Sequence, residues 1–108
     1  MITIEDFRKI ELKAGRVLSV EPHPNADRLL VLKVDLGEGD IRQLVAGVKP
    51  FYPDPQALVG RTVAVVANLQ PAQLRGVESQ GMILAASGGE TVSILSPDRE
   101  VPPGSKVS

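Results

Sequence analysis

The sequence predicts an all-β fold in which five or six short strands form one nearly closed barrel. Its apolar stretches are short and are bounded by Gly, Pro, Asn or Asp, as core strands usually are. Most of these stretches are separated by turns, and the repeated helical segments that a parallel sheet requires are missing. The 108 residues suffice for a single domain, residues 1–108, with its own core.

The composition narrows the possible functions. The chain has no cysteine, which excludes disulfides, thiol catalysis and thiolate metal sites. Its net charge of −1 provides no global attraction to nucleic acid, so any such binding requires a local basic patch. No apolar run approaches the ~20 residues that span a bilayer. The N-terminus, MITIEDFRK, lacks a secretory pattern. We therefore expect a cytoplasmic protein without a membrane partner.

A short helix is predicted at the N-terminus. Thr3 can cap its first turn, and Asp6 completes a capping-box pattern three residues later. The helix should end near Lys9 or Ile10. Its apolar side consists of Ile4, Phe7 and, if the helix is long enough, Ile10. This side must be covered by the barrel or by a second subunit.

Residues 11–21 have a strand-like pattern, and Gly15 within them indicates a bulge or a bend. The following segment, Pro22–Asp27, breaks the strand because it combines prolines with turn-forming residues. It contains His23, the only histidine of the chain, so no second histidine is available for a metal site or a proton relay. We expect His23 to be a surface residue of this loop.

The stretch Leu29–Leu36 is the clearest strand prediction. One face carries the apolar residues Leu30, Leu32, Val34 and Leu36. Lys33 points to the opposite face, away from the core. A tight turn at Gly37–Asp40 leads into Ile41–Ala46, the partner strand of a hairpin. Arg42 lies on this partner strand, so Lys33 and Arg42 are candidates for one shared outer face, with two ordinary surface cations as the alternative.

The segments that follow alternate between irregular stretches and short strands. Residues 47–53 are irregular, and Asp54-Pro55 followed by Gly60 predicts a short helix between the third and fourth strands. Further strands are predicted over Thr62–Ala67, Met82–Ala86 and Thr91–Leu95. The tail from Ser96 onward is rich in turn residues.

Between two predicted core strands lies the polar segment Asn68–Met82, NLQPAQLRGVESQGM. Pro71, Gly76 and Gly81 prevent it from continuing as one strand or one helix. Its hydrogen-bonding residues are Asn68, Gln73, Arg75, Glu78, Ser79 and Gln80. A polar loop held by two strands is a frequent location of function, although a solvated connector is the alternative.

The order of these elements favours an OB-fold, a five-stranded Greek-key barrel that is partly open. The ligand-binding surface of such a barrel consists of strands two and three with the loops between strands one and two and between strands four and five. In this chain these elements carry Lys33 and Arg42, residues 22–28, and the segment Asn68–Met82. The polar segment thus falls where such a barrel binds its ligand.

Two stretches, VLSVEPHPNADRLLVLKVDLG and ANLQPAQLRGVESQGMILAA, carry a family resemblance. They resemble the tRNA-binding domain found at the C-terminus of many bacterial methionyl-tRNA synthetases and as free-standing tRNA-binding proteins. The resemblance covers essentially the whole chain. It implies an OB-fold homodimer that binds tRNA by its overall shape, without catalytic residues, cofactor or metal. A methionyl-tRNA synthetase catalytic region, in cis or in trans, is a further implied partner.

The resemblance also implies which positions contact RNA. These are Lys33, Arg42, Asn68, Arg75, Ser79 and Met82. The three cations suit phosphates, the amide and the hydroxyl suit phosphate, ribose or a base edge, and Met82 offers an adaptable apolar surface. Aromatic residues make up only 3% of the chain, so stacking platforms are scarce and recognition of backbone and shape is favoured.

Three other functions compete with this interpretation. A secretion-type chaperone branch shares the fold and binds unfolded polypeptide, but it differs in the loop that here reads PHPNADRL. An enzyme would need a motif such as a nucleophile elbow or a phosphate loop, and none surrounds Ser79 and Glu78. A dimerisation module of a larger synthetase is compatible with tRNA binding and is not separated from it by the sequence.

Overall fold

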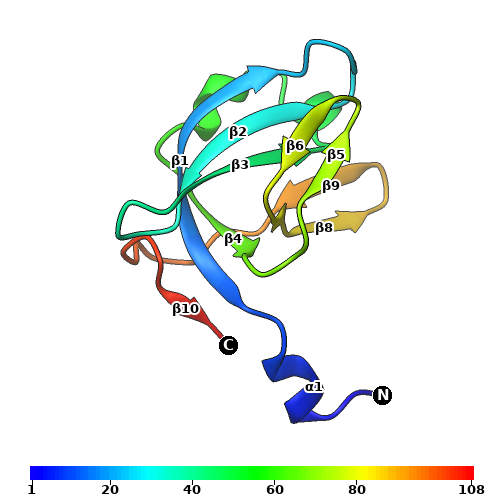
Figure 1. Ribbon diagram of the computed structural model, residues 1–108. Helices are drawn as coiled ribbons and strands as arrows, with labels where there is room; N and C mark the ends of the chain where they lie inside the picture. Colours follow the sequence, from blue (N-terminus) through cyan, green and yellow to red (C-terminus); the bar gives the residue numbers. More distant parts are fainter.

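A computed structural model of residues 1–108 shows an antiparallel barrel to which two hairpins and a short helix are attached (Figure 1). The central sheet has the strand order β3-β2-β1-β4-β7. Its strands are β1 (Leu12–Pro22), β2 (Leu30–Asp35), β3 (Ile41–Ala46), β4 (Thr62–Val66) and β7 (Met82–Ile83). The predicted all-β fold, a nearly closed barrel of five strands, is confirmed.

Smaller elements surround this sheet. They are α1 (Ile4–Arg8), η1 (Lys49–Phe51), η2 (Pro55–Leu58), β5 (Ala72–Leu74), β6 (Val77–Ser79), β8 (Ala85–Gly88), β9 (Thr91–Ile94) and β10 (Lys106–Val107). The short helix predicted between Asp54 and Gly60 exists as the 3₁₀ turn η2, to which Asp54 makes no side-chain capping bond. A second 3₁₀ turn, η1, lies within residues 47–53, which were predicted to be irregular. The longest helix, α1, has five residues, and no helix is of a length and apolarity to cross a membrane.

The core follows the predicted alternation along β2. Leu30, Leu32, Val34 and Leu36 are all buried, together with apolar residues of the other barrel strands. The largest of the fully buried side chains are Leu30, Leu32, Leu44, Leu58, Val17, Val34, Val63 and Val65. Leu and Val side chains therefore fill most of the barrel core, to which aromatic residues contribute little. The half-buried Tyr52 packs at the edge of this core, and its hydroxyl accepts a hydrogen bond of 2.9 Å from the backbone N–H of Ile94.

Strand β1 holds the barrel together because it has two partners. Its first part, up to Arg16, pairs with β4, and the part from Arg16 to Pro22 pairs with β2. Gly15 lies in regular register with β4, and the register shift occurs farther along the strand, at Leu18. Of the two alternatives predicted for Gly15, a bulge or a bend, the bulge is therefore wrong. A Cβ atom on Gly15 would come within 2.5 Å of Val34, so close packing accounts for the glycine.

The barrel closes where the chain between β6 and β7 meets β3. The Gln80 backbone N–H donates to the Gln43 carbonyl oxygen at 2.8 Å, and the Gln43 N–H donates to the Gln80 side-chain oxygen at 2.9 Å. The segment Asn68–Met82 that contains Gln80 is not a simple loop, because β5 and β6 form a hairpin within it. This hairpin, called the β5–β6 hairpin below, stands in front of β2 and β3 in Figure 1.

Helix α1 has the predicted capping box. The Asp6 N–H donates to the Thr3 hydroxyl oxygen and the Thr3 N–H donates to the Asp6 carboxylate, both at 3.2 Å. The helix ends at Arg8, with Lys9 as its C-cap. None of its residues is buried, and it projects from the barrel beside the C-terminus (Figure 1). On the apolar side of α1, Ile4 is therefore exposed and Phe7 is half-buried.

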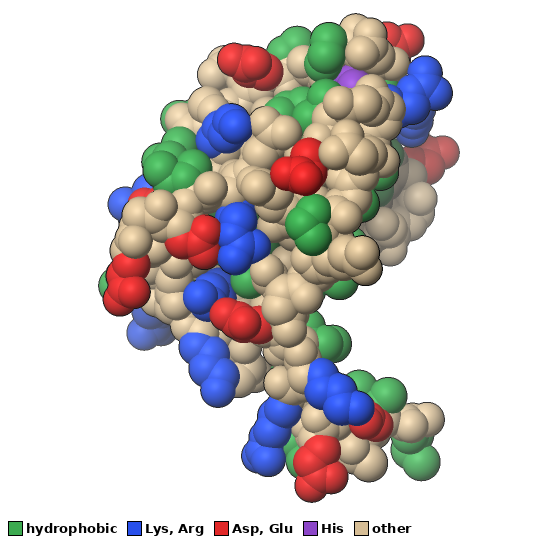
Figure 2. All heavy atoms as spheres, in the orientation of Figure 1, with side chains coloured by type: hydrophobic (Ala, Val, Ile, Leu, Met, Phe, Trp, Pro, Cys, Tyr) green, Lys and Arg blue, Asp and Glu red, His purple; other side chains and the backbone are tan.

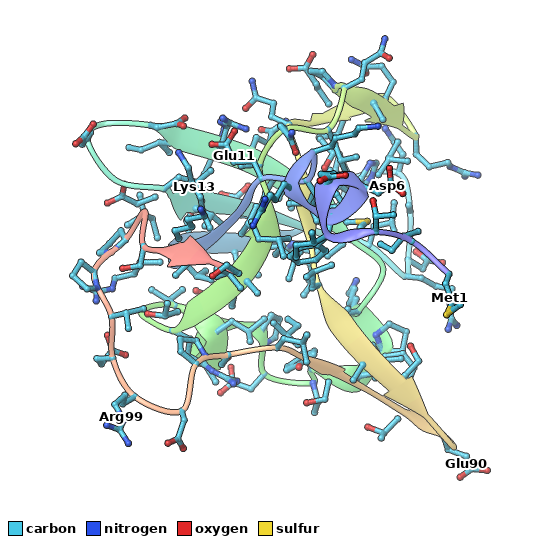
Figure 3. All side chains as sticks on the ribbon, turned by 90° about the horizontal axis from the view of Figure 1, so that it is seen from below. Met1, Asp6, Glu11, Lys13, Glu90 and Arg99 are labelled. Atoms are coloured by element: carbon cyan, nitrogen blue, oxygen red, sulfur yellow. The ribbon has the colours of Figure 1, made fainter.

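The C-terminal tail is more ordered than its turn-rich sequence indicated. Strand β10 pairs with the start of β1, where Leu12 lies opposite Val107 and Lys13 opposite Lys106. Figure 3, which views the molecule from below, shows β10 close to Lys13 and Glu11 at this end of the barrel. Lys13 and Glu11 form an ion pair of 3.2 Å there.

Candidate nucleic-acid interface

Lys33 lies on the outer face of the β2–β3 ribbon, as predicted. The register places it opposite Gln43, and its Nζ donates to the Gln43 side-chain oxygen at 2.9 Å. The Gln43 side-chain nitrogen in turn donates to the Glu78 carbonyl oxygen on β6 at 2.8 Å. Gln43 thereby links Lys33 to the β5–β6 hairpin, a role that the sequence analysis missed.

Arg42 does not share the outer face with Lys33. It lies opposite Val34, whose side chain is in the core, so Arg42 points toward the barrel end and not toward the outer surface. The expectation of a shared face was wrong because the side chains of a strand alternate and Gln43, the next residue, takes the outer position. The five residues between Asp35 and Ile41 fix this register.

The Arg42 guanidinium is almost fully engaged within the protein. Its Nε and Nη2 donate to the two carboxylate oxygens of Asp40 at 2.8 and 3.1 Å. Its Nη1 donates to the carbonyl oxygens of Ala67 at 2.8 Å and Gln80 at 3.0 Å. Arg42 therefore ties β3 to the end of β4 and to the chain that closes the barrel.

Ser79 and Asn68 also make internal bonds. Ser79 is 4% exposed, and its hydroxyl accepts from the Val45 N–H at 3.0 Å and donates to the Gly81 carbonyl oxygen at 2.9 Å. The exposed Asn68 accepts from the Glu11 N–H at 2.8 Å and donates to the Lys9 carbonyl oxygen at 2.7 Å. The two side chains hold the β5–β6 hairpin and the α1–β1 connection in place.

Arg75 is exposed at the turn of the β5–β6 hairpin. It has a φ of +53°, and the next residue, Gly76, has a φ of +90°, which is the backbone pattern of a two-residue hairpin turn. The Arg75 Nη2 donates to the carbonyl oxygen of Asn25 at 3.3 Å. The hairpin turn therefore lies against the loop between β1 and β2.

His23 lies in this same loop but is buried, so the prediction of a surface histidine was wrong. Its ring contacts the carbonyl oxygen of Leu74 in the β5–β6 hairpin at 2.9 Å. Burial of His23 depends on the hairpin packing over the loop. Because the segment Asn68–Met82 was expected to be a loop, the sequence provided no indication that it would cover His23.

Met82 is 45% exposed and borders a shallow groove between β3 and the β5–β6 hairpin. The groove has a volume of about 390 Å³ and its largest exposed apolar residues are Leu69, Leu74 and Met82. The barrel thus offers an apolar depression next to the polar hairpin.

Two of the three predicted cations are free of ion pairs. Arg42 forms an ion pair with Asp40, whereas Lys33 and Arg75 have no carboxylate partner within 4 Å. Figure 2 shows Lys and Arg side chains spread over this face among acidic groups, some of them at the upper right beside the histidine. The charge available to a ligand is local, as the net charge of −1 requires.

Comparison with known proteins identifies the domain. Residues 12–106 match a family described as "Putative tRNA binding domain". The chain is 57% identical over 106 residues to the methionine–tRNA ligase of Pyrococcus furiosus, in a match that covers 98% of this chain and 14% of the ligase. The chain thus spans about one seventh of the length of this curated relative.

Solved structures with the same fold include two that match over nearly their whole length. One is the MetRS-related protein from Pyrococcus horikoshii, with a TM-score of 0.92, 33% identity, and coverage of 100% of this chain and 98% of that chain. The other is the chaperone CsaA from Bacillus anthracis, with a TM-score of 0.89, 30% identity, and coverage of 100% and 99%. The predicted fold and resemblance are confirmed, and the chain belongs to the tRNA-binding domain family.

Proposed function

We propose that this domain is a non-catalytic module that binds tRNA by its overall shape. The observation that carries the proposal is the pair of unpaired cations, Lys33 and Arg75, on a surface held rigid by Gln43 and the β5–β6 hairpin. A lysine provides a point charge and an arginine a planar fork for phosphate oxygens. Met82 and its groove provide an apolar contact for a ribose or an unstacked base.

The six predicted contact residues then divide into two groups. Lys33, Arg75 and Met82 are exposed and are proposed to touch RNA directly. Arg42, Asn68 and Ser79 use their polar atoms within the protein: Arg42 and Ser79 are proposed to position the surface that touches RNA, and Asn68 the α1–β1 connection. A surface that is already ordered favours binding, because no free energy is lost in ordering the protein's loops when the RNA binds.

The scarcity of aromatic residues supports recognition of shape over sequence. Single-strand binders stack bases on aromatic side chains, and this chain has only one tyrosine and two phenylalanines. A folded RNA with a defined arrangement of phosphates suits a surface made of a few cations and an apolar groove. Such a module would serve in the cytoplasm, with a methionyl-tRNA synthetase catalytic region joined in cis or supplied in trans.

We further propose that the domain acts as a homodimer. Ile4 on the apolar side of α1 is exposed, and a groove of about 360 Å³ between α1 and β10 is lined in part by Ile10, Leu12 and Val107. A second copy would cover these side chains. Two tRNA-binding surfaces in one particle would also raise the apparent affinity through effective concentration.

A chaperone that holds unfolded polypeptide is the second candidate. It is favoured by one observation, the apolar groove at Met82, together with the similarity to a solved structure named as the chaperone CsaA. The groove is small and the surface beside it is charged, so we rank this candidate below tRNA binding. Both ligands would compete for Met82.

The test is a titration of labelled bulk tRNA at two salt concentrations, beside an RNA duplex of equal length. We expect preference for tRNA and a log K that falls by about 0.7–0.9 per phosphate contact for each log unit of salt. Met82→Ala should weaken binding without altering the salt slope, because it removes no charge. Equal affinity for tRNA and duplex would refute recognition of tRNA shape. No binding at low salt, with capture of an unfolded polypeptide, would favour the chaperone.

A further inference from the structure

The only histidine of the chain bridges two segments that are far apart in the sequence. His23 is 5% exposed, and its Nδ1 accepts a hydrogen bond of 2.9 Å from the backbone N–H of Asn25. Its Nε2 lies 2.9 Å from the carbonyl oxygen of Leu74, 51 residues away on β5. The ring therefore connects the loop between β1 and β2 to the β5–β6 hairpin.

The two partners of the ring define its protonation state. The Asn25 N–H is a donor, so Nδ1 must be an acceptor without a proton. The Leu74 oxygen is an acceptor, so Nε2 must carry the hydrogen. A neutral imidazole with its hydrogen on Nε2 satisfies both bonds. A second proton would place a donor at Nδ1 opposite the Asn25 donor, so the bridge is complete only when the ring is neutral.

Arg75 strengthens the same connection. Its Nη2 donates to the Asn25 carbonyl oxygen at 3.3 Å, so Asn25 is bonded to His23 through its N–H and to the hairpin turn through its oxygen. The base of the loop is closed by a bond from the His23 N–H to the Leu29 oxygen at 3.1 Å. The loop and the hairpin are thereby joined at two points, His23 to Leu74 and Arg75 to Asn25, beside one buried ring.

We propose that His23 is a positioning residue for RNA binding. Its neutral ring fixes the β1–β2 loop and the β5–β6 hairpin as one surface, and protonation of the ring separates them. The charged groups on the two segments are Glu21, Asp27, Arg28, Arg75 and Glu78. None of these forms an ion pair with the ring, so the connection between the loop and the hairpin depends on hydrogen bonding. The effect of His23 on RNA binding rests on the proposed function, whereas the His23 bridge between the loop and the hairpin does not.

Two substitutions separate the two halves of the bridge. In His23→Asn, the amide oxygen takes the place of Nδ1 and keeps the bond to the Asn25 N–H, but the side chain is too short to reach Leu74. In His23→Gln, the amide nitrogen takes the place of Nε2 and keeps the bond to Leu74. Gln56→Ala is the matched control, since its side chain also donates to a backbone oxygen, that of Val20 on β1 at 2.8 Å, and makes no bond to the loop or the hairpin.

The bridge is tested first by amide hydrogen exchange in the protein without RNA. In His23→Asn, the β5–β6 hairpin amides should exchange about three- to tenfold faster, which corresponds to the loss of one hydrogen bond. His23→Gln should retain most of the protection, and the core amides of β2 should be unchanged in both, which shows that the variants fold. Unchanged hairpin exchange in His23→Asn would overturn the bridge.

The effect on RNA is tested by tRNA binding at a series of pH values from 8 downward. At pH 8, His23→Asn should bind about three- to tenfold more weakly than the wild type, and His23→Gln should recover most of that loss. On acidification the wild type should weaken relative to His23→Gln, which has no ring to protonate.

These outcomes are separable from failure of the proposed function. Because the chain has one histidine, the difference between the wild-type and His23→Gln pH profiles reports on His23 alone. Identical profiles, or wild-type affinity in His23→Asn, would overturn the positioning role. A wild-type chain that binds no tRNA would refute the proposed function, and hydrogen exchange would then decide on the bridge by itself.

Discussion

The side chain of Arg42 shows how a cation near a binding surface can serve the architecture. Four of its hydrogen bonds lead to Asp40, Ala67 and Gln80, which belong to three different segments of the barrel. An arginine suits this position because its planar fork satisfies a carboxylate and two carbonyl oxygens at once. A lysine would satisfy fewer of these partners.

We predict that Arg42→Ala lowers the free energy of unfolding by about 1–3 kcal/mol, because two backbone carbonyls lose a charged donor. tRNA binding should weaken, but the slope of log K against log salt should stay at the wild-type value. Denaturant unfolding and tRNA titration at several salt concentrations measure both quantities. Lys33→Ala is the comparison variant: it should leave stability within about 0.5 kcal/mol and reduce the slope by about 0.7–0.9. A reduced slope in Arg42→Ala would show that Arg42 contacts phosphate after all.

The residues of the site differ in how well the sequence predicts whether their side chains are exposed or buried. Lys33 is exposed on the outer face because alternation along a strand is a local property, and the apolar residues on either side of it fix that alternation. Burial of His23 and of Ser79 depends instead on the β5–β6 hairpin, which packs from another part of the chain. The sequence pattern around a residue carries no information about a segment that packs over it from another part of the chain.

At the scale of elements, the β5–β6 hairpin is the least predictable part and the most important for the site. Its strands have three residues each, and their polar residues, together with Gly76 in the turn, resemble those of a loop. The turn needs two consecutive residues with positive φ, and Arg75 occupies one of these positions although arginine rarely adopts it. Hydrogen bonds from Gln43, Val45 and Arg42 to this part of the chain hold it in place.

Gly76→Ala should loosen this hairpin without removing a charge. Gly76 has a φ of +90°, and a Cβ atom there would meet no atom within 4 Å, so the cost is confined to the backbone. We expect a local cost of about 1–3 kcal/mol, faster amide exchange in β5 and β6, and weaker tRNA binding with an unchanged salt slope. Hydrogen exchange and tRNA titration measure these effects.

Gly39→Ala is a matched control for this prediction. Gly39 has a φ of +80° and equally open surroundings, but it lies in the turn between β2 and β3, away from the β5–β6 hairpin. It should incur a similar backbone cost and leave exchange in β5 and β6 unchanged. If both glycine variants bind tRNA equally well, the hairpin is not part of the interface.

The β2–β3 hairpin and helix α1 were predictable because their signals are contiguous in the sequence. A capping box fixed the start of α1, and an apolar alternation with a glycine-rich turn fixed β2 and β3. Strand β10 was missed because its two residues become a strand only by pairing with β1, more than ninety positions earlier in the chain. The bulge in β1 was misplaced for a related reason: the packing of Val34 against Gly15 is a tertiary contact.

At the scale of the whole molecule, the proposed RNA surface and the proposed dimer surface are built from different elements. The outer face of β2 and β3, the β1–β2 loop and the β5–β6 hairpin make up the first, whereas α1 and β10 form the second (Figure 1). Asn68 holds the second surface in shape, because its side chain bonds to the backbone of Lys9 and Glu11 on either side of the α1–β1 connection. Helix α1 is therefore presented in a defined orientation, which a dimer interface requires.

Ile4→Asp tests whether a second copy covers α1. Ile4 is 59% exposed and begins the helix, where an added carboxylate is compatible with the helix dipole, so the helix and the barrel should both remain folded. We expect the particle to become monomeric by sedimentation at micromolar concentration, and its apparent affinity for tRNA to fall at least about tenfold as the second binding surface is lost. Leu18→Asp, at a residue of β1 that is 43% exposed, should keep the wild-type mass and affinity. An Ile4→Asp protein that stays dimeric would place the interface elsewhere, and a monomeric wild type would refute the dimer itself.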